Sequence, residues 1–335
     1  MVSQTDAQQQ EPASPIEQVL FEIKKVIVGQ EQLLERMLVA LLSRGHILVE
    51  GVPGLAKTLA IRTVAQVIGG QFNRVQFTPD LVPADLVGTR VYNQKTGEFS
   101  TSLGPVFTNL LLADEINRAP AKVQSALLEV MQEHQVTIGR ETHRVPEPFL
   151  VLATQNPIET EGTYALPEAQ IDRFMLKVLI GYPQHDEELT VVQRQLVDYQ
   201  ELRQALSLED LKALQRAVFE IYVDPSLVSY AVDIATATRE PSAHGLPDLA
   251  GYISYGASPR GPISLVQGAR ALALLRGREY VLVEDLQALA RDALRHRLVL
   301  SYQALAEDVS PDAILDQVLA VVTAPQLDLA RVNAA

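Results

Sequence analysis

The sequence contains no cysteine among its 335 residues, and this absence removes several kinds of chemistry at once. Without thiols the chain can form no disulfide framework, no thiolate metal site and no cysteine nucleophile. It also lacks an apolar run near the roughly 20 residues that a membrane-spanning helix needs. Its start, Met1-Val2-Ser3-Gln4-Thr5-Asp6, has neither the basic flank nor the apolar core of a secretory signal. We therefore expect a cytoplasmic protein.

Basic residues are scarce relative to acidic ones. The chain has 28 Lys and Arg against 41 Asp and Glu, which gives a formal net charge of −13. Nonspecific binding to a nucleic-acid backbone depends on clustered cations, so this balance argues against such binding by the chain as a whole. A local basic pore would still be compatible with it. Internal repeats of 20–50 residues are also missing, which argues against a solenoid.

The length and composition are those of a globular protein with two domains. A chain of 335 residues is too long for one ordinary hydrophobic core. Up to Tyr182-Pro183, apolar runs typical of buried strands alternate with amphipathic helices, which predicts a doubly wound α/β domain. Helical periodicity dominates after that point. We therefore predict a disordered tail over 1–14, an α/β domain over 15–183 and a smaller helical domain over 184–335.

Individual elements follow from periodicity and from capping signals. Ser14 is a helix N-cap, because Pro15 and Glu17 follow it in the first turn. The predicted helices cover 15–26, 33–42, 59–65, 121–134, 185–199, 208–219, 225–238, 262–276 and 283–295. The predicted strands cover 46–49, 74–77, 110–113, 149–153 and 175–180, with two hairpins over 90–100 and 135–145.

One stretch connects a predicted strand to a predicted helix through a loop rich in glycine and proline that ends in Lys57-Thr58. This order is what a phosphate-binding loop requires, because the backbone N–H groups and the helix N-terminus form a cradle for an anion. Lys57 would reach the outer phosphates, and the Thr58 hydroxyl would hold a Mg²⁺ ion. The predicted cradle consists of Gly51, Val52, Pro53, Gly54, Leu55, Ala56, Lys57, Thr58 and Leu59.

The loop departs from the strict pattern G-x-x-x-x-G-K-[ST] at its second glycine, which is Ala56. A methyl group is tolerable at that position only if the residue has a negative φ. The departure weakens the loop as a signal on its own. Residues further along the chain must therefore support the nucleotide-binding interpretation.

Two acidic residues, Asp114 and Glu115, follow the apolar run 110–113. Because that run has no polar alternation, it predicts a strand buried on both faces, and ligands bind at the carboxyl ends of such strands. Asp114 could hold the Mg²⁺ ion directly or through water, and Glu115 could orient and deprotonate a water. Without the phosphate loop, the simpler interpretation would be that the pair caps the following helix.

Three further residues could complete a site for phosphoryl transfer. Asn156 ends a neighbouring strand and could hydrogen-bond the γ-phosphate or the attacking water, although Asn-Pro is also typical of a simple turn. Arg173 precedes the last sheet strand and could be either a surface ion-pair partner or a cation supplied to a neighbouring subunit's nucleotide. Arg260 begins a helix in the second domain, where the helix dipole disfavours a cation unless a phosphate faces it.

The ordered motifs GVPGLAKT, LLLADEINRAP, ATQNP, PEAQIDRF and GASPRG make the chain resemble the MoxR family of AAA+ ATPases over about residues 15–330. In that family, alanine is usual at the position of Ala56. The resemblance implies a P-loop AAA+ nucleotide-binding domain over 15–183 and a helical lid domain over 184–335. It also implies Walker A at Gly51–Thr58, Walker B at Asp114 and Glu115, sensor 1 at Asn156, the arginine finger at Arg173, sensor 2 at Arg260, and adenine-pocket residues Val28 and Gly29.

The resemblance also assigns the two predicted hairpins. Residues near 90–101 resemble the helix-2 insert of the AAA+ clade that contains MoxR, magnesium chelatase and the MCM helicases. Residues 135–145 resemble the pre-sensor-1 hairpin of that clade. Arg118 could be a second contact to a neighbouring protomer, with a helix cap or an ion pair as an equally weighted alternative.

For function, the resemblance implies a homo-oligomer, a hexameric ring, that binds ATP and Mg²⁺. Hydrolysis would drive chaperone-like remodelling or maturation of partner proteins, including von Willebrand factor A domain proteins and in some cases metal insertion. Two alternatives stay open. A nucleic-acid motor could use Arg140, His143 and Arg144 to line a pore, and a nucleotide-gated scaffold with negligible turnover would use the same pocket. The client itself cannot be read from the sequence.

Overall fold

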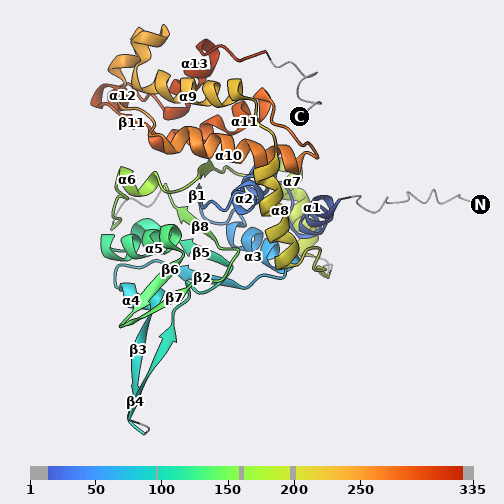
Figure 1. Cartoon of the computed structure of the whole chain (residues 1–335), viewed down its shortest axis with the longest axis vertical. Helices are drawn as coiled ribbons and strands as arrows, with labels where there is room; N and C mark the ends of the chain where they lie inside the picture. The colour runs from blue at the N-terminus through green and yellow to red at the C-terminus, as the bar shows by residue number, and fades with distance from the viewer. Residues whose placement is uncertain (1–13, 96, 158–161, 197–200, 327–335) are drawn as a thin grey trace, which may run out of the picture.

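The computed structural model describes residues 14–95, 97–157, 162–196 and 201–326. Its centre is a five-stranded parallel sheet with the strand order β2-β5-β8-β1-β9 (Figure 1). These strands are β1 (Ile47–Glu50), β2 (Phe72–Gln76), β5 (Leu110–Asp114), β8 (Leu150–Gln155) and β9 (Leu176–Leu179). The strand order and the intervening helices confirm the predicted doubly wound α/β fold. The predicted disordered tail, apart from Ser14, lies outside the described residues.

Side chains of the central strands alternate between two apolar cores, one on each face of the sheet. Val49 and Leu112 belong to the first core, whereas Leu48 and Ala113 belong to the second. The first core continues from helices α1, α2 and α3 into the helical part of the chain. The bounds of these helices are Pro15–Val26, Glu31–Leu42 and Lys57–Val67, and α5 (Ala121–Glu133) packs on the second core.

The start of α1 confirms the predicted N-cap. The Ser14 hydroxyl accepts a hydrogen bond from the backbone N–H of Glu17 (3.2 Å), and the Glu17 carboxylate accepts one from the N–H of Ser14 (3.0 Å). Pro15 occupies the first helical position, where its missing N–H costs nothing. This reciprocal cap fixes where α1 begins.

Two antiparallel hairpins accompany the sheet, as predicted. The first, β3 (Gly88–Asn93) with β4 (Glu98–Leu103), follows the short helix α4 (Pro83–Val87) and projects away from the rest of the molecule (Figure 1). The second is β6 (Gln135–Ile138) with β7 (Glu141–Arg144). The Thr101 hydroxyl donates a hydrogen bond to the Glu141 carboxylate (3.3 Å), so the two hairpins touch.

The chain after β9 is mainly helical, as predicted, and its later helices lie together above the sheet in Figure 1. The helices are α6 (Glu168–Ile171), just before β9, then α7 (His185–Gln195), α8 (Leu208–Glu220), α9 (Pro225–Arg239), α10 (Arg260–Leu275), α11 (Val283–Leu294), α12 (Tyr302–Ala306) and α13 (Pro311–Val321). Single 3-10 turns cover Ile116–Arg118, Pro241–His244, Pro247–Gly251 and Arg295–Arg297. The sequence did not predict the small antiparallel sheet of β10 (Ile253–Tyr255) and β11 (Val299–Leu300).

Several boundaries differ from the predicted ones by one or more residues; β2, for example, covers Phe72–Gln76 where 74–77 was predicted. Helix α7 ends at Gln195, and most of the extension predicted to residue 199 lies outside the described residues. Helix α10 begins at Arg260, which confirms the expectation that this residue begins a helix, although the apolar periodicity alone indicated a start at 262. Among the described helices, none combines the length and the apolar character that crossing a membrane would require.

Candidate functional site

The parallel register brings the ends of adjacent strands to one level. Gln76 lies opposite Asp114, and Val49 lies opposite Thr154. Because β8 is flanked by β1 and β5, Asn156 after β8 lies between the phosphate loop after β1 and the acidic pair at the end of β5. The result is one pocket of about 430 Å³. It is lined by Pro53, Gly54, Leu55, Ala56, Lys57, Thr58, Leu59, Arg74, Gln76, Asp114, Glu115, Thr154 and Asn156.

Two glycines give the phosphate loop its path. A Cβ on Gly51 would lie 2.4 Å from a side-chain atom of Ile180 and 2.8 Å from its carbonyl oxygen, so only glycine fits there. Gly54 has a φ of +87°, which residues with a side chain rarely adopt. The loop then enters α3, which has neither a side-chain cap at its N-cap position nor an acidic residue in its first turn. Its first N–H groups are therefore suited to an anion.

The condition that a methyl group at position 56 requires a negative φ is wrong. Its φ is +56° and its ψ is +20°, which is the left-handed conformation. That conformation costs a residue with a Cβ about 1–2 kcal/mol. The side chain is exposed, so the methyl group has room and the cost is confined to the backbone. Alanine, the smallest residue after glycine, therefore tolerates the turn that opens α3.

Lys57 begins α3, and its ammonium group folds back over the loop. Its Nζ donates a hydrogen bond to the carbonyl oxygen of Gly51 (2.6 Å). Partial burial lowers the pKa of this ammonium group, and the carboxylates of Asp114 and Glu115 oppose that shift. A negatively charged ligand in the pocket would favour the charged form of Lys57 in the same way as these carboxylates.

Asp114 is held from the strands on both sides of it. Its Oδ1 accepts a hydrogen bond from the Thr154 hydroxyl (2.6 Å), and its Oδ2 lies 2.7 Å from Nη2 of Arg74. The Thr154 hydroxyl also accepts a hydrogen bond from the backbone N–H of Glu115 (2.8 Å). Arg74 and Thr154 were not predicted from the sequence, because only the pairing of β2 and β8 with β5 brings them to this carboxylate.

Glu115 follows β5 directly and has a left-handed backbone conformation, with a φ of +55°. Its Oε2 accepts hydrogen bonds from Nε2 of Gln76 (2.7 Å) and from Nη1 of Arg118 (3.0 Å). The ion-pair alternative for Arg118 is therefore present within the protomer. Gln76 is a third residue of the pocket that the sequence analysis missed, and its position opposite Asp114 explains why it reaches this site.

The oxygen atoms at the pocket suit a Mg²⁺ ion but do not form a complete cage. Thr58 and Asp114 both line the pocket, and a hydroxyl and a carboxylate are hard donors of the kind that Mg²⁺ prefers. Nowhere in the described ranges do three or more His, Asp or Glu side chains gather into a metal-binding group. A Mg²⁺ ion held here would therefore share the remaining coordination with water and phosphate oxygens.

Four of the residues predicted to bind the nucleotide do not line this pocket: Val28, Gly29, Gly51 and Val52. Gly51 and Val52 begin the phosphate loop, so they lie next to the lining residues in the chain. Val28 and Gly29 lie elsewhere, between α1 and α2, where a Cβ on Gly29 would be 2.8 Å from the carboxylate of Glu187 in α7. Their assignment to an adenine pocket stays a prediction.

The two predicted arginines, Arg173 and Arg260, do not line the pocket either. Arg173 faces a separate cavity beside α5, and its Nη1 donates a hydrogen bond to the carbonyl oxygen of Leu128 (3.1 Å). Nε of Arg260 lies 3.9 Å from Oδ2 of Asp172, the residue before Arg173. The two arginines are thus close to each other through Asp172 and away from the phosphate loop of their own protomer.

Two family profiles match the chain. The profile described as the ATPase family associated with various cellular activities (AAA) matches residues 46–176, and the profile described as an AAA lid domain matches residues 249–318. The first match runs from the residue before β1 to the first residue of β9. The second covers α10 and α11, which pack over the sheet.

Curated relatives match almost the whole chain. Chaperone MoxR1 of Mycobacterium tuberculosis is 55% identical over 93% of this chain and 83% of its own length. The protein YeaC of Bacillus subtilis is 44% identical (90% and 92%), and the protein MoxR of Paracoccus denitrificans is 33% identical (90% and 93%). A crystal structure of a candidate ATPase from Cytophaga hutchinsonii superposes with a TM-score of 0.89 at 47% identity, over 93% of this chain and 95% of that one.

Proposed function

Because the chain belongs to the MoxR family of AAA+ ATPases, we propose that it binds ATP with Mg²⁺ in the pocket at the strand ends and hydrolyses it to ADP and phosphate. The observation that supports this proposal most strongly is the convergence of the phosphate loop with the ends of β5 and β8 on one pocket. Phosphoryl transfer to water needs a phosphate cradle, metal ligands and a group that positions water, and all three are available there.

Each lining residue has a role in this proposal. Lys57 would exchange its hydrogen bond to the Gly51 carbonyl for the outer phosphates. Thr58 and Asp114 would hold Mg²⁺, which neutralises phosphate charge when bound. Glu115 would position and deprotonate the attacking water, and Asn156 would hydrogen-bond the γ-phosphate.

The positions of Arg173 and Arg260 support a ring. A cation is needed at the transferring phosphoryl group, yet neither arginine lines the pocket of its own protomer. We propose that both act on the nucleotide of a neighbouring protomer in a homo-oligomer, with the hexamer as the expected size. The cavity beside Arg173 has a volume of about 360 Å³ and is lined in part by Glu129 and Glu133 of α5. This face therefore also carries negative charge that a basic surface of a neighbouring protomer could contact.

The client is proposed to be a protein. The hairpin β3–β4 exposes large apolar side chains at its surface, with Tyr92 at 51% and Phe99 at 59% exposure. The centroids of these two rings lie 5.0 Å apart. Exposed aromatic pairs of this kind are typical of protein contact sites. The name of the relative MoxR1 describes it as a chaperone. We propose remodelling or maturation of a partner with a von Willebrand factor A domain, with metal insertion as one form of that maturation.

Three variants test the ATPase proposal in the full chain. Lys57→Ala should weaken binding of a fluorescent ATP analogue, Glu115→Gln should bind it without turnover, and Arg173→Ala should bind it normally but lose nearly all phosphate release. Arg291→Ala, which changes an exposed arginine on α11, serves as the control and should retain activity. Equal turnover by the wild type and Glu115→Gln would contradict hydrolysis and favour the scaffold alternative. Normal turnover by Arg173→Ala would refute its role in trans.

The client proposal has its own test. The ATP-bound Glu115→Gln protein should bind a purified von Willebrand factor A domain partner, and the double variant Tyr92→Ser/Phe99→Ser should bind it at least about tenfold more weakly, as expected when two interface anchors are removed. Turnover should be measured in parallel with single-stranded and double-stranded DNA. Stimulation by DNA, with no binding of the protein partner, would favour the nucleic-acid motor instead.

A further inference from the structure

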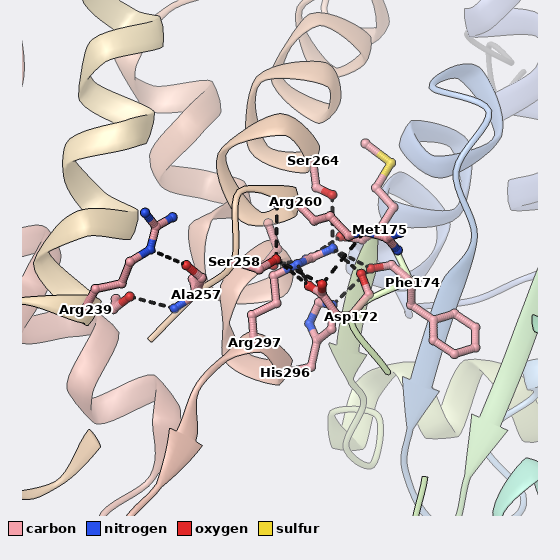
Figure 2. Close-up of polar contacts among 12 residues, drawn as sticks. Asp172, Phe174, Met175, Arg239, Ala257, Ser258, Arg260, Ser264, His296 and Arg297 are labelled. Carbon is pink, nitrogen blue, oxygen red and sulfur yellow. Dashed lines mark hydrogen bonds and ion pairs between the residues drawn. The ribbon is translucent and has the colours of Figure 1, made fainter. Parts of the chain in front are cut away.

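Arg297 lies almost wholly inside the protein, with 1% of its side chain exposed, on the 3-10 turn Arg295–Arg297. Its guanidinium group forms hydrogen bonds with the segment that leads into β9 (Figure 2). Nε donates a hydrogen bond to Oδ1 of Asp172 (2.8 Å). The two terminal nitrogens donate to the backbone carbonyl oxygens of Asp172 (3.1 Å), Phe174 (2.8 Å) and Met175 (3.2 Å). One side chain therefore fixes the backbone on both sides of Arg173.

Asp172 is bound from its other side by the loop before α10. The Ser258 hydroxyl donates to both carboxylate oxygens of Asp172, at 3.0 and 2.9 Å. The same hydroxyl oxygen accepts a hydrogen bond from the backbone N–H of Arg260 (3.2 Å). We call the group of Asp172, Ser258 and Arg297 the Asp172 clamp, and Figure 2 shows it between the two segments. Within the clamp, Asp172 and Ser258 connect Arg173, which follows Asp172 in the chain, to the backbone of Arg260.

The loop that carries Ser258 is itself anchored. Nε of Arg239 donates a hydrogen bond to the carbonyl oxygen of Ala257 (2.6 Å), and the backbone N–H of Ala257 donates to the Thr238 hydroxyl (2.9 Å). A Cβ on Gly256 would lie 2.4 Å from the carbonyl oxygen of Thr238, so only glycine lets the loop pass this close to the end of α9. Movement of the lid helices would therefore be transmitted to the clamp.

We propose that Arg297 is a positioning residue for ATP hydrolysis, which holds Asp172 so that Arg173 and Arg260 are presented together to the nucleotide of a neighbouring protomer. This inference rests on the proposed function, because it assigns Arg173 and Arg260 to that neighbouring site. Arg297 itself touches no nucleotide pocket in the described structure. Its contribution would be geometric, and a displacement of about 1 Å at a catalytic group can lower a rate about hundredfold.

The opposite charges of Arg297 and Asp172 favour keeping the two side chains together. Burial lowers the pKa of the Arg297 guanidinium to about 10, so the group remains positive at neutral pH and balances the Asp172 carboxylate. Without Arg297, the cation left beside Asp172 would be Arg260, at 3.9 Å. Asp172 would then compete for the arginine that is proposed to bind phosphate.

The chain offers a matched control two residues away. Arg295 lies on the same turn and is similarly buried, with 8% of its side chain exposed. It binds Asp292 (2.8 Å), Asp312 (2.8 and 2.9 Å) and the carbonyl oxygen of Lys177 (2.8 Å), none of which belongs to the Asp172 clamp. Changing Arg295 therefore disturbs the same interface without disturbing Asp172.

The experiment compares Arg297→Lys with Arg295→Lys in the full chain. A lysine keeps the charge but cannot bond the Asp172 carboxylate, four backbone carbonyl groups, which include that of Ala293, and the Ser264 hydroxyl together. Both variants should lose thermal stability. We expect Arg297→Lys to lower kcat about ten- to hundredfold while the Kd for the ATP analogue and the KM stay within about twofold. Arg295→Lys should keep kcat within about twofold of the wild type.

Ser258→Ala keeps the test decisive if Arg297→Lys does not fold. It removes only the hydroxyl that joins Asp172 to the loop of Arg260, and it should lower kcat by about three- to tenfold with an unchanged Kd. Unchanged kcat in both Arg297→Lys and Ser258→Ala, or equal losses in Arg297→Lys and Arg295→Lys, would overturn the positioning role while leaving the ATPase intact. Wild-type turnover no higher than that of Glu115→Gln would overturn the proposed function, and the positioning role with it.

Discussion

Two regions of this protein use the same residue types in opposite ways. At the nucleotide pocket, Arg74 and Arg118 pair with Asp114 and Glu115 while 49% and 43% of the two arginine side chains stay exposed. Between the sheet and the lid, Arg36, Arg295 and Arg297 are buried, and each makes several hydrogen bonds. The first set can exchange partners when a charged ligand enters. The second set fixes the relative position of two parts of the chain.

The energetic consequences of the two arrangements differ. An exposed ion pair contributes about 0–1 kcal/mol, because water competes for both partners. Removing one partner of a buried pair costs about 3–5 kcal/mol, because the other charge is left without compensation. Changes in the pocket should therefore alter activity with little effect on stability, whereas changes in the buried clusters should alter stability first. The following predictions test this contrast, from the largest expected effect to the smallest.

The largest effect is expected in the pocket. Glu115→Gln removes the proposed base and should lower kcat by about 10²–10⁴-fold, the range typical of general-base catalysis. The melting temperature should change by no more than a few degrees, because the amide can still accept a hydrogen bond from Gln76. Phosphate release and calorimetry on the same samples measure both quantities. A loss of activity that is matched by unfolding would contradict the contrast.

The second effect concerns the buried cluster of Asp292 with Arg36 and Arg295. Asp292→Ala should lower the free energy of unfolding by about 3–5 kcal/mol, because Asp292 is 2% exposed and two guanidinium groups would lose their partner. Asp316→Ala is the matched control, since its pair with Arg291 is about half exposed (48% and 52%). It should cost less than about 1 kcal/mol. Urea denaturation measures both, and similar costs would show that burial does not separate the two kinds of pair.

The third effect is a loss of stability in acid that originates in a buried histidine. Nδ1 of His46 accepts a hydrogen bond from the backbone N–H of Val151 (3.0 Å), and Nε2 contacts the carbonyl oxygen of Met131 (3.0 Å). The ring must be neutral, because an Nδ1 that accepts a hydrogen bond carries no proton. Burial lowers the pKa of His46 from 6.5 to about 4. The unfolded chain therefore takes up this proton first as the pH falls. The contribution of neutral His46 to the free energy of unfolding should be fully present above about pH 6.5. The free energy of unfolding should then fall by about 3 kcal/mol as the pH falls to 4.

The measurement is the free energy of unfolding in urea at several pH values between 7 and 4. His46→Gln should show a shallower dependence on pH than the wild type, since it lacks the titrating group. His185→Gln, at an exposed ring on α7, should leave the wild-type dependence unchanged. An identical slope in the wild type and His46→Gln would contradict the assignment. Burial lowers the pKa of His296 in the same direction, so some dependence on pH should persist in His46→Gln.

The smallest effect is expected at Arg74, which pairs with Asp114 across two strands. Arg74→Gln frees one oxygen of the carboxylate that is proposed to hold Mg²⁺. We expect the Mg²⁺ concentration needed for half-maximal turnover to change by about two- to fivefold, with stability changed by less than about 1 kcal/mol. Titration of Mg²⁺ in the ATPase assay measures this change. Loss of all turnover would instead place Arg74 in the chemical step.

Local patterns were sufficient to predict most of the fold. The apolar runs before Glu50 and Asp114 indicated buried strands, and Ser14 indicated a helix start through its cap. The same patterns placed Lys57 at the start of the helix after the phosphate loop and Glu115 directly after a strand. The strand order itself was not predicted, because it depends on pairing between strands that lie far apart in the sequence. That Asp114 and Asn156 should lie near the phosphate loop followed from the rule that ligands bind where the carboxyl ends of parallel strands meet.

The missed residues depend on contacts between distant parts of the chain. Gln76 and Arg74 reach the pocket only through the register of β2 with β5, which no local pattern encodes. Arg297 meets Asp172 across 125 positions of sequence, so neither residue carries a local signal of the clamp. The condition of a negative φ at Ala56 was wrong for a different reason. It assumed that the methyl group would be a steric barrier, whereas the methyl group is exposed and only the backbone is strained.

The central claim is that each pocket is complete only when a second protomer supplies Arg173. Mixing two variants with little activity tests it directly: Lys57→Ala should bind nucleotide weakly but retains Arg173, and Arg173→Ala should bind nucleotide but lacks that cation. The account predicts that each variant alone releases little phosphate, and that the mixture recovers a substantial fraction of wild-type turnover once subunits exchange. If the mixed oligomers form and turnover stays at the level of the separate variants, the claim of a shared site is contradicted.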